Sequence, residues 1–322
     1  MQLGALAGLK PAKRMREVFG DAILELCRHD EKVVILDGDL SSTTYTKGIR
    51  LEFPERFYNI GIAESNMVSI AAGLASCGYI PFASSLASFI LANGYDQLRI
   101  SVAIANLNVK VLGSHGGITL GKDGATAMAP EDLALVGTLP TFVILVPSDP
   151  ASMHKAVQAA AKYVGPVYLR SSRVAMPHIY PDGDCPFEIG QANVVRQGDD
   201  VTIIGCGLMV AAALDAAVLL AREGIEARVV DMHTVRPLDE AAIVAAARET
   251  GAIVTAEEHF LHGGVGSNIA RIVAQNQPVP MRFVGLADIY TDSGEPDDLL
   301  EKYHLTANDI VAAAREAVAA KK

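Results

Sequence analysis

One acidic residue, Glu64, interrupts a largely apolar stretch of the sequence, NIGIAESNMVSIAAG at positions 59–73. Apolar burial disfavours the charged form of a carboxyl group, which is a condition for donating a proton near neutral pH. The sequence alone offers a simpler default, because an acid in the first turn of a helix is stabilised by the helix dipole. The pattern therefore indicates a carboxylate beside a core helix and leaves both explanations open.

Two other polar segments follow expected strands. ILDGDLSSTT contains Asp37, Asp39 and four hydroxyls. Open α/β sheets bind ligands at this end of their strands, but a helix cap or an Asx turn explains the same residues. The loop GSHGGITLGKDGATAMAPED carries five glycines, His115 and Asp123. Long glycine-rich loops in compact domains are usually functional, so we expect a binding role here, although a capped surface histidine would fit the same pattern.

Arginines near the same predicted edge suit an anionic substrate. Arg170 and Arg173 lie beyond a strand end, in VYLRSSR, and Arg16 lies in the first expected helix. Guanidinium groups that converge on one crevice would bind phosphate, because each presents a fork of donors to its oxygens. Taken singly, each arginine is more commonly a surface ion-pair partner.

Two segments resemble ligand motifs only superficially. AEEHFLHGGVG holds two histidines beside acidic residues, but its E-E-H-x-x-H order lacks the helix that would place both rings on one face. GCGLMV follows an expected strand and lacks the third glycine of the dinucleotide fingerprint. We therefore expect no metal held by these residues and no dinucleotide site.

The elements that must position these residues follow an α/β pattern. Short β-branched runs alternate with Ala-rich segments of helical period, which predicts βαβ units and parallel sheets. The segment 177–190, rich in Pro, Gly and Asp, is interpreted as an interdomain linker. The strands expected before it are 32–38, 110–116, 141–149 and 165–173, and those after it are 200–207, 226–234 and 252–259. We predict two doubly wound α/β domains, the second one smaller.

Composition narrows the function classes. A length of 322 residues suits two domains, and a net charge of −10 with a pI near 5.3 argues against nucleic-acid or anionic-membrane surfaces. Apolar runs break well before the ~20 residues that span a bilayer, and the N-terminus lacks the order of a signal peptide. The four cysteines form no C-x-x-C pair. We expect a cytoplasmic protein with reduced thiols and no membrane or nucleic-acid partner.

From Arg16 to about Gly266 the chain resembles the C-terminal part of a transketolase, a thiamine-diphosphate enzyme. The resemblance runs through IAESNMVSIAAG, PFASS, YDQLR, GSHGGITLGKDG, MAPEDLAL, VPSD, LRSSR, VVDMHTVRPLD and EEHFLHGGVG, in family order and spacing. It implies a pyrimidine-binding domain with a parallel sheet at residues 1–180 and a smaller transketolase C-terminal domain at 190–322.

The resemblance also implies roles for single residues. Glu64 would protonate or hydrogen-bond the far ring nitrogen of the cofactor's aminopyrimidine, and Phe89 would pack on that ring. Asp39 matches an acidic residue near the cofactor, and His115 and Asp123 match groups that contact sugar hydroxyls, His115 also being a catalytic candidate. The residues that match a cradle for the distal phosphate of the substrate are Arg16, Thr43, at a position where serine is usual, and Arg173.

Some positions depart from the family pattern. Leu86 stands where a second aromatic is usual, and Ala127 stands where His or Gln commonly contacts the aminopyrimidine. A larger departure is that DGDLSS has the wrong order for the G-D-G motif that, with a later Asn, holds the diphosphate and its metal. We therefore expect half of a two-component transketolase, with thiamine diphosphate and a divalent cation such as Mg²⁺ held mainly by an N-terminal partner subunit.

The expected assembly is a heterotetramer with two copies of each subunit, because cofactors in this family lie between chains. The expected reaction moves a two-carbon ketol unit from a ketose to an aldose. The arginines favour a phosphorylated ketose as the donor. Two alternatives stay open. One is a beta-type subunit of a thiamine-diphosphate enzyme with a 2-oxo acid donor, and the other is a catalytically idle binding or regulatory protein.

Overall fold

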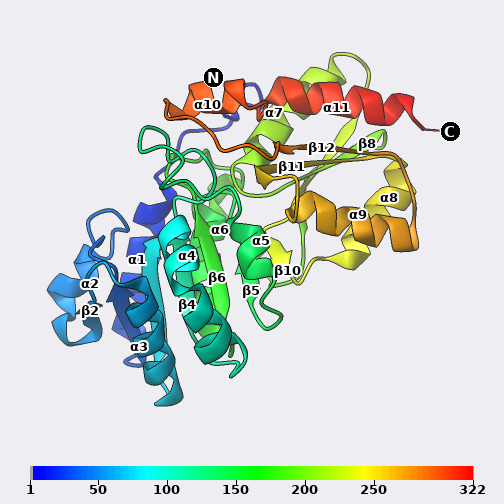
Figure 1. Ribbon diagram of the computed structural model, residues 1–322. Coiled ribbons are helices and arrows are strands. Elements are labelled where there is room, and N and C mark those ends of the chain that lie inside the picture. The colour runs from blue at the N-terminus through cyan, green and yellow to red at the C-terminus, as the bar shows by residue number, and fades with distance from the viewer. Residues whose placement is uncertain (1–2, 322) are drawn as a thin grey trace.

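The computed structural model describes residues 3–321 and consists of two α/β units (Figure 1). The first sheet has the strand order β10-β5-β6-β4-β3-β1-β2 and is parallel except where β10 meets β5. Its strands from the first unit are β1 (Val33–Asp37), β2 (Phe57–Asn59), β3 (Ile80–Leu86), β4 (Lys110–Ser114), β5 (Val143–Leu145) and β6 (Val167–Ser171). Most are buried along their whole length, as expected of parallel strands covered on both faces.

Helices cover both faces of this sheet. On one face, α1 (Met15–His29) packs against α6 (Pro150–Lys162), and on the other α3 (Glu64–Ser76) packs against α4 (Ala87–Gln97), beside α5 (Asp132–Gly137). A capping box at Asp149 fixes the start of α6. The remaining elements of this unit are α2 (Lys47–Glu52), a 3-10 turn at Pro54–Arg56 and a π turn at Leu98–Ala103 that extends α4.

The second sheet has the order β12-β11-β8-β9-β7, with only β7 antiparallel among the described residues. Its strands are β7 (Asn193–Arg196), β8 (Val201–Gly205), β9 (Ala227–Asp231), β11 (Ile253–Phe260) and β12 (Met281–Leu286). Its helices are α7 (Met209–Ala221), α8 (Glu240–Thr250), α9 (Val265–Asn276), α10 (Pro296–Lys302) and α11 (Ala307–Ala319). The predicted fold class, two α/β units with mainly parallel sheets, is confirmed.

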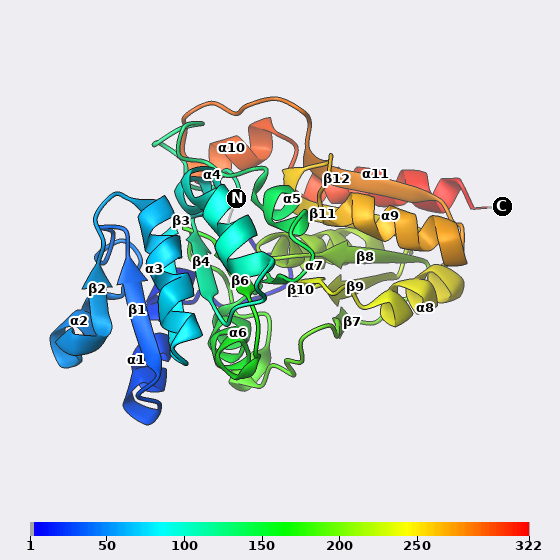
Figure 2. The ribbon, with the colours of Figure 1, turned by 60° about the horizontal axis from the view of Figure 1, so that its bottom comes forward.

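The two units are joined by more than the connecting segment. Strand β10 (Thr234–Arg236) follows β9 in the chain but pairs with β5 of the first sheet, so it lies between the units (Figure 1, Figure 2). The connecting segment is fixed at Tyr180, whose hydroxyl donates to the Asp231 carboxylate at 2.6 Å and whose N–H donates to Asp149 at 3.1 Å. These contacts tie the segment to both sheets.

The residues ahead of α1 also reach the second unit. The N–H groups of Gly4 and Ala7 donate to the carboxylate of Asp215 on α7, at 2.7 and 2.8 Å. The chain therefore crosses the second unit before it builds the first sheet. Within residues 3–321, no helix is both long enough and apolar enough to cross a membrane.

Candidate active site

The predicted site residues gather at one edge of the first sheet. Strands β1, β3, β4 and β6 are neighbours there, and their carboxyl ends lead into Asp39, Phe89, His115 and Arg173 respectively. Helix α3 follows β2 and begins at Glu64, beside the same edge. The topology therefore brings together residues that lie far apart in the sequence, at the edge where open α/β sheets bind ligands.

Glu64 is the first residue of α3 and is 3% exposed. Ser85 Oγ, near the end of β3, donates to its Oε1 at 2.9 Å, and Asn93 Nδ2 of α4 lies 3.4 Å from its Oε2. A carboxylate offers about four lone-pair positions, so these two donors leave acceptor capacity for a ligand. The first-turn position and the buried, hydrogen-bonded carboxyl group occur together, so the two explanations given for Glu64 are compatible.

The backbone passes close to this carboxyl group at Gly38. A Cβ added to Gly38 would lie 3.3 Å from Ser85 Oγ and 3.7 Å from Glu64 Oε1. The neighbouring Ser84 Oγ is buried and has no hydrogen-bond partner among the described residues. Successive side chains of a strand point to opposite faces, so the Ser84 hydroxyl lies on the other face of β3 from Ser85. The glycine that keeps space beside the buried acid is what fits a polar ring bound at Glu64.

His115 follows β4 and is 2% exposed, with a backbone φ of 62°. Its Nδ1 lies 2.7 Å from Ser114 Oγ, and its Nε2 lies 3.4 Å from a guanidinium nitrogen of Arg16. Burial, and then the charges of Arg16 and Arg173, lower the pKa of His115 to about 3. Because a guanidinium only donates, Nε2 accepts and the neutral ring carries its proton on Nδ1, facing Ser114.

Arg16, in the first turn of α1, contacts both the 43–45 segment and His115. It donates to the backbone oxygen of Thr43 at 3.2 Å and lies 5.4 Å from the ring centroid of Tyr45. Its Nε is buried and has no hydrogen-bond partner among the described residues. Burial and the nearby charge of Arg14 lower the pKa of Arg16, so the positive charge here is poorly compensated. An anionic ligand would satisfy both the unpaired donor and the charge.

Arg173 and Asp123 form an ion pair at 3.1 Å, and Arg173 also donates to the backbone oxygen of Leu120. Both side chains are partly open to solvent. Arg173 borders a pocket of about 400 Å³ whose lining includes four cationic side chains, those of Arg14, Arg16, Lys122 and Arg173. On the far side, Lys122 pairs with Glu295 of the second unit at 2.6 Å. The pocket is thus mostly basic, and the second unit contributes Glu295 and Pro296 to its lining.

The two acids of the DGD segment differ. Asp37 is fully buried and accepts from the N–H of Leu40 at 2.6 Å and from the hydroxyls of Thr44 and Thr46, so it organises the turn, and burial raises its pKa. Asp39 is exposed, has a φ of 65° and accepts from Asn59 Nδ2 at 2.9 Å. The Asx-turn explanation therefore applies to Asp37, whereas Asp39 remains open to a ligand.

The two residues that depart from the family pattern, Leu86 and Ala127, lie on β3 and on the glycine-rich loop, near the start of α4. Leu86 ends β3 and is 8% exposed, and Phe89 lies in the first turn of α4, partly buried. The backbone oxygen of Ala127 accepts from Ser88 Oγ at 2.9 Å, which joins the glycine-rich loop to α4. At Ala127 the loop thus contacts α4 through its backbone.

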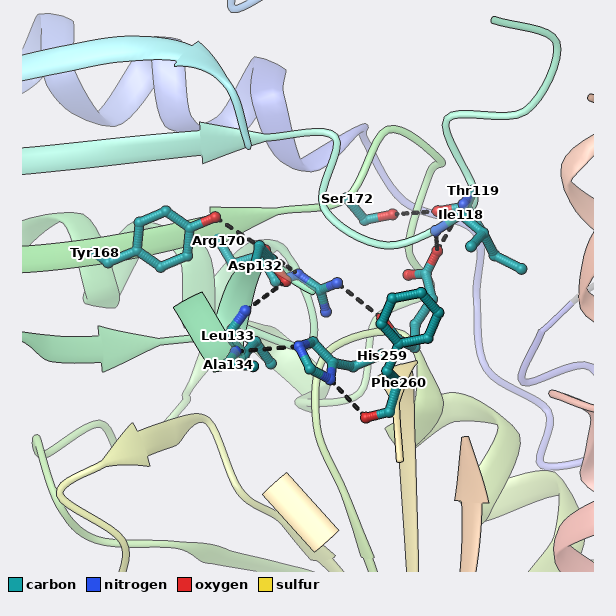
Figure 3. A network of polar contacts seen from close by, with 11 residues as sticks. Ile118, Thr119, Asp132, Leu133, Ala134, Tyr168, Arg170, Ser172, His259 and Phe260 are labelled. Carbon is teal, nitrogen blue, oxygen red and sulfur yellow. Dashed lines mark hydrogen bonds and ion pairs between the residues drawn. The ribbon is translucent and has the colours of Figure 1, made fainter. Parts of the chain in front are cut away.

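Arg170 is not part of the basic pocket. It is 5% exposed, its Nε donates to Asp132 Oδ2 at 2.9 Å, and the Tyr168 hydroxyl donates to the same oxygen (Figure 3). Nη2 of the Arg170 guanidinium donates to the backbone oxygen of Glu258 in β11, at 2.8 Å. The expectation that Arg170 converges with Arg173 on phosphate is wrong, because its guanidinium is used in the contact between the two units.

The segment AEEHFLHGGVG is structural in a way that its sequence did not reveal. The carboxylate of Glu257 accepts from the N–H groups of Val265 and Gly266 at the start of α9, and Glu258 accepts from Ile118 and Thr119 of the first unit. His259 accepts from the Ala134 N–H at 3.2 Å. Among residues 3–321, no cluster of three or more His, Cys, Asp or Glu side chains has the arrangement of a metal site.

Sequence reasoning missed Ser85 and Asn93, which hold Glu64, and Glu258, which holds the glycine-rich loop. Ser85 lies in the PFASS motif at a strand end, which was a usable signal. Two consecutive acids at the end of a buried strand, Glu257 and Glu258, also demanded partners, since buried carboxylates are almost always paired.

Comparison with known families gives two matches that together cover most of the chain. The family model described as "Transketolase, pyrimidine binding domain" matches residues 12–178, and "Transketolase, C-terminal domain" matches residues 190–310. The matches fall on the first and second units and leave the connecting segment between them.

Relatives of similar length agree with these models. The chain is 42% identical to the 6-deoxy-6-sulfo-D-fructose transketolase subunit SqwH of Clostridium sp. (strain MSTE9), over 94% of each chain. It is 37% identical to an apulose-4-phosphate transketolase subunit of Phocaeicola vulgatus, over 94% of this chain and 97% of that one. Among solved structures, a split gene transketolase described as an inactive beta4 tetramer superposes with a TM-score of 0.91 at 44% identity, covering 97% and 100% of the two chains.

Proposed function

Because the chain belongs to the transketolase family, as the C-terminal subunit of a two-component enzyme that transfers a ketol unit, we propose that it acts on a phosphorylated ketose donor through the edge of the first sheet. The observation that carries this proposal is the basic pocket next to buried His115, where Arg16 keeps a buried donor without a partner among the described residues. Such a pocket needs an anion to complete it.

Membership of the family implies dependence on thiamine diphosphate, and we assign its pyrimidine end to Glu64 and Phe89 with Asp39 nearby. When bound, this cofactor supplies the nucleophilic carbon that ketol transfer needs. Glu64 would hold a proton against the far nitrogen of the aminopyrimidine, while Ser85 and Asn93 fix its carboxyl group. The space kept by Gly38 and the free acceptor capacity of Glu64 support this assignment.

At the substrate end, His115 and Asp123 would hydrogen-bond the sugar hydroxyls, and Arg16, Thr43 and Arg173 would bind the distal phosphate. Nε2 of the neutral His115 ring would accept from a sugar hydroxyl in place of its 3.4 Å contact with Arg16, while Nδ1–H keeps its contact with Ser114. Arg173 would exchange part of its contact with Asp123 for the phosphate, which frees the Asp123 carboxylate for a sugar hydroxyl. Arg173 and Asp123 would thus each have a partner both before and after the substrate binds.

We further propose that an N-terminal subunit holds the diphosphate and a divalent cation such as Mg²⁺, in a cytoplasmic heterotetramer of two copies of each chain. Exposed residues beside Glu64 support a partner there: Ile62 is 83% exposed, and one exposed face of α3 carries Asn66, Ser69, Ile70 and Gly73. A small, partly apolar helix face allows a second chain to approach closely. The related split gene transketolase, an inactive tetramer of beta chains, agrees with a need for the other subunit.

The test is reconstitution. The purified chain is mixed with the subunit that carries the diphosphate-binding domain, and ketol transfer from a phosphorylated ketose to an aldose is measured with thiamine diphosphate and Mg²⁺. We expect Glu64→Ala to lower the rate by about a hundredfold or more, the usual contribution of acid–base catalysis. Glu31→Ala, at an exposed acid ahead of β1, is the matched control.

Two results would contradict the proposal. Transfer near the wild-type rate in Glu64→Ala would remove the role assigned to Glu64. Release of CO₂ from a 2-oxo acid donor, without transfer from any phosphorylated ketose, would replace the proposed substrate class.

A further inference from the structure

The glycine-rich loop of the site is packed against the second unit along its glycines. A Cβ added to Gly117, which has a φ of 77°, would lie 2.2 Å from the carboxyl carbon of Glu258. At Gly124 it would lie 2.4 Å from Ser293 Oγ, and at Gly121 it would lie 3.1 Å from the backbone oxygen of Gly294. At these three positions the absent side chains make room for the second unit.

Glu258 makes the central contact of this interface. It lies near the end of β11, is 3% exposed, and its Oε1 accepts from the consecutive N–H groups of Ile118 and Thr119, both at 2.6 Å. Arg170 holds the backbone of Glu258 from β6, and the Thr119 hydroxyl lies 3.2 Å from Ser172 Oγ (Figure 3). The loop is therefore fixed from both units at one point.

That point lies between the two loop residues assigned to the sugar hydroxyls, each of which contacts an arginine that lines the basic pocket. His115 precedes Ile118 by three residues and contacts Arg16, while Asp123 follows Thr119 by four residues and contacts Arg173. The loop also has bonds of its own, including the turns closed at Gly121 and Gly124 and the bridge between Gly117 and Ala129, and Arg173 of the first unit donates to its Leu120 oxygen. Glu258 thus adds to these bonds a buried contact from the second unit, placed between His115 and Asp123.

We propose that Glu258 is a positioning residue for the substrate site, holding His115 and Asp123 at the spacing that a sugar phosphate requires. The inference rests on the proposed function for the identity of the substrate. It gives the second unit a direct part in substrate binding, exerted from a residue that does not itself touch the basic pocket.

The adjacent Glu257 offers a matched control. It is equally buried, at 1% exposed, and its carboxylate likewise accepts two backbone N–H bonds, from Val265 at 2.6 Å and Gly266 at 2.8 Å. These partners belong to its own unit, because successive side chains of a strand point to opposite faces. Glu257→Ala therefore removes a comparable set of buried bonds without releasing the loop.

The experiment compares Glu258→Ala, Glu258→Gln and Glu257→Ala in the reconstituted complex. We expect Glu258→Ala to raise the KM for the phosphorylated ketose at least tenfold, with the Kd for thiamine diphosphate within twofold of wild type. Glu258→Gln, whose amide oxygen can still accept both N–H bonds, should restore most of the affinity. Glu257→Ala should lower the Tm by about as much as Glu258→Ala does, but should leave the KM for the phosphorylated ketose unchanged.

Hydrogen exchange of the 115–124 loop supplies a readout that does not need activity. It should accelerate in Glu258→Ala and stay at the wild-type rate in Glu257→Ala. If Glu258→Ala does not fold, Glu258→Asp, which keeps the charge but shortens the reach, takes its place with the same expected changes.

Equal KM values and equal loop exchange in the Glu257 and Glu258 variants would overturn the inference. An inactive wild-type complex would contradict the proposed function instead, and unchanged loop exchange in Glu258→Ala would then still refute the holding role. Accelerated exchange would support that role independently of the substrate.

Discussion

A guanidinium nitrogen of Arg16 lies 3.4 Å from Nε2 of His115, so a cation from the first helix directly contacts a buried imidazole that follows β4. Burial, Arg16 and Arg173 together hold the pKa of His115 at about 3. The ring is therefore neutral at any physiological pH, and its Nε2 lone pair is oriented by Arg16. This relationship makes the histidine a hydrogen-bonding group of fixed tautomer.

Arg16→Gln should raise the pKa of His115 toward its usual value near 6.5, and only part of the way, because the largest cause, burial, remains. The measurement is an NMR titration of the His115 ring. Since the folded pKa lies below the unfolded one, His115 costs stability as pH falls from about 6.5 toward 3, and the variant should lose less stability over that window. A His115 pKa that does not move in the variant would contradict the contact.

Arg173→Gln should raise the KM for a phosphorylated donor about tenfold or more. The reason is that a hydrogen bond to a charged group contributes about 1.5–3 kcal/mol, and about 1.4 kcal/mol is a tenfold change. Steady-state kinetics of the reconstituted enzyme measure it, with an unphosphorylated ketose as the comparison donor. Arg222→Gln, at an exposed arginine after α7, is the control. Equal losses with both donors would argue against a phosphate contact.

Gly73→Leu should have opposite effects on the folded chain and on its assembly. A Cβ at Gly73 would meet no atom within 4 Å, and replacing glycine within a helix gains roughly 0.5–1 kcal/mol. The free energy of unfolding, from urea titration of the isolated chain, should rise. Sedimentation of the mixture with the N-terminal subunit should show weakened association, because the side chain would fill the exposed face of α3. Normal assembly would show that the partner does not cover this face.

Asp231→Asn should flatten the dependence of stability on pH. Burial raises the pKa of Asp231 from 3.8 to about 7, so the folded state keeps a proton that the unfolded state releases near pH 4. The contribution of this group therefore falls as pH rises from about 4 to about 7. Asparagine does not titrate and keeps an oxygen for Ser148 and Tyr180.

Unfolding free energies at pH 5, 6, 7 and 8 test this prediction. The slope should be smaller in Asp231→Asn than in wild type and unchanged in Asp199→Asn, whose side chain is 97% exposed in the wild-type chain. Glu257, whose pKa burial also raises to about 7, keeps part of the slope in every variant. If the unfolding free energy changes with pH in the same way in wild type and in Asp231→Asn, the raised pKa of Asp231 is refuted.

The sequence predicted the parts of the site that depend on local pattern. Strands ending near residues 37, 114 and 171 are recognisable from β-branched runs, and parallel topology then places Asp39, His115 and Arg173 on one edge. Glu64 at the start of a helix followed from the same kind of pattern. These placements need only periodicity and the rule that parallel strands share an edge.

What the sequence could not supply depends on how the two units dock. Arg170 looked equivalent to Arg173, yet Asp132, which lies 38 positions away, and the backbone of Glu258 occupy its guanidinium. The segment predicted as one strand at 226–234 ends in β9 at Asp231, and the chain then changes sheets to form β10 at Thr234. The partners of Arg170 and the change of sheet after β9 both depend on contacts between residues far apart in the sequence, which a local pattern does not reveal.

Strand β10 has a consequence for how this polypeptide is made and divided. Until Arg236 has emerged from the ribosome, the first sheet ends at β5, with a row of unpaired backbone groups along its side. A fragment cut within the 177–190 segment would keep the three-residue β5 as an edge strand permanently. The first sheet is thus completed only by a strand from the second homology domain, so a truncation that keeps the whole sheet must extend to Arg236 rather than end in the connecting segment.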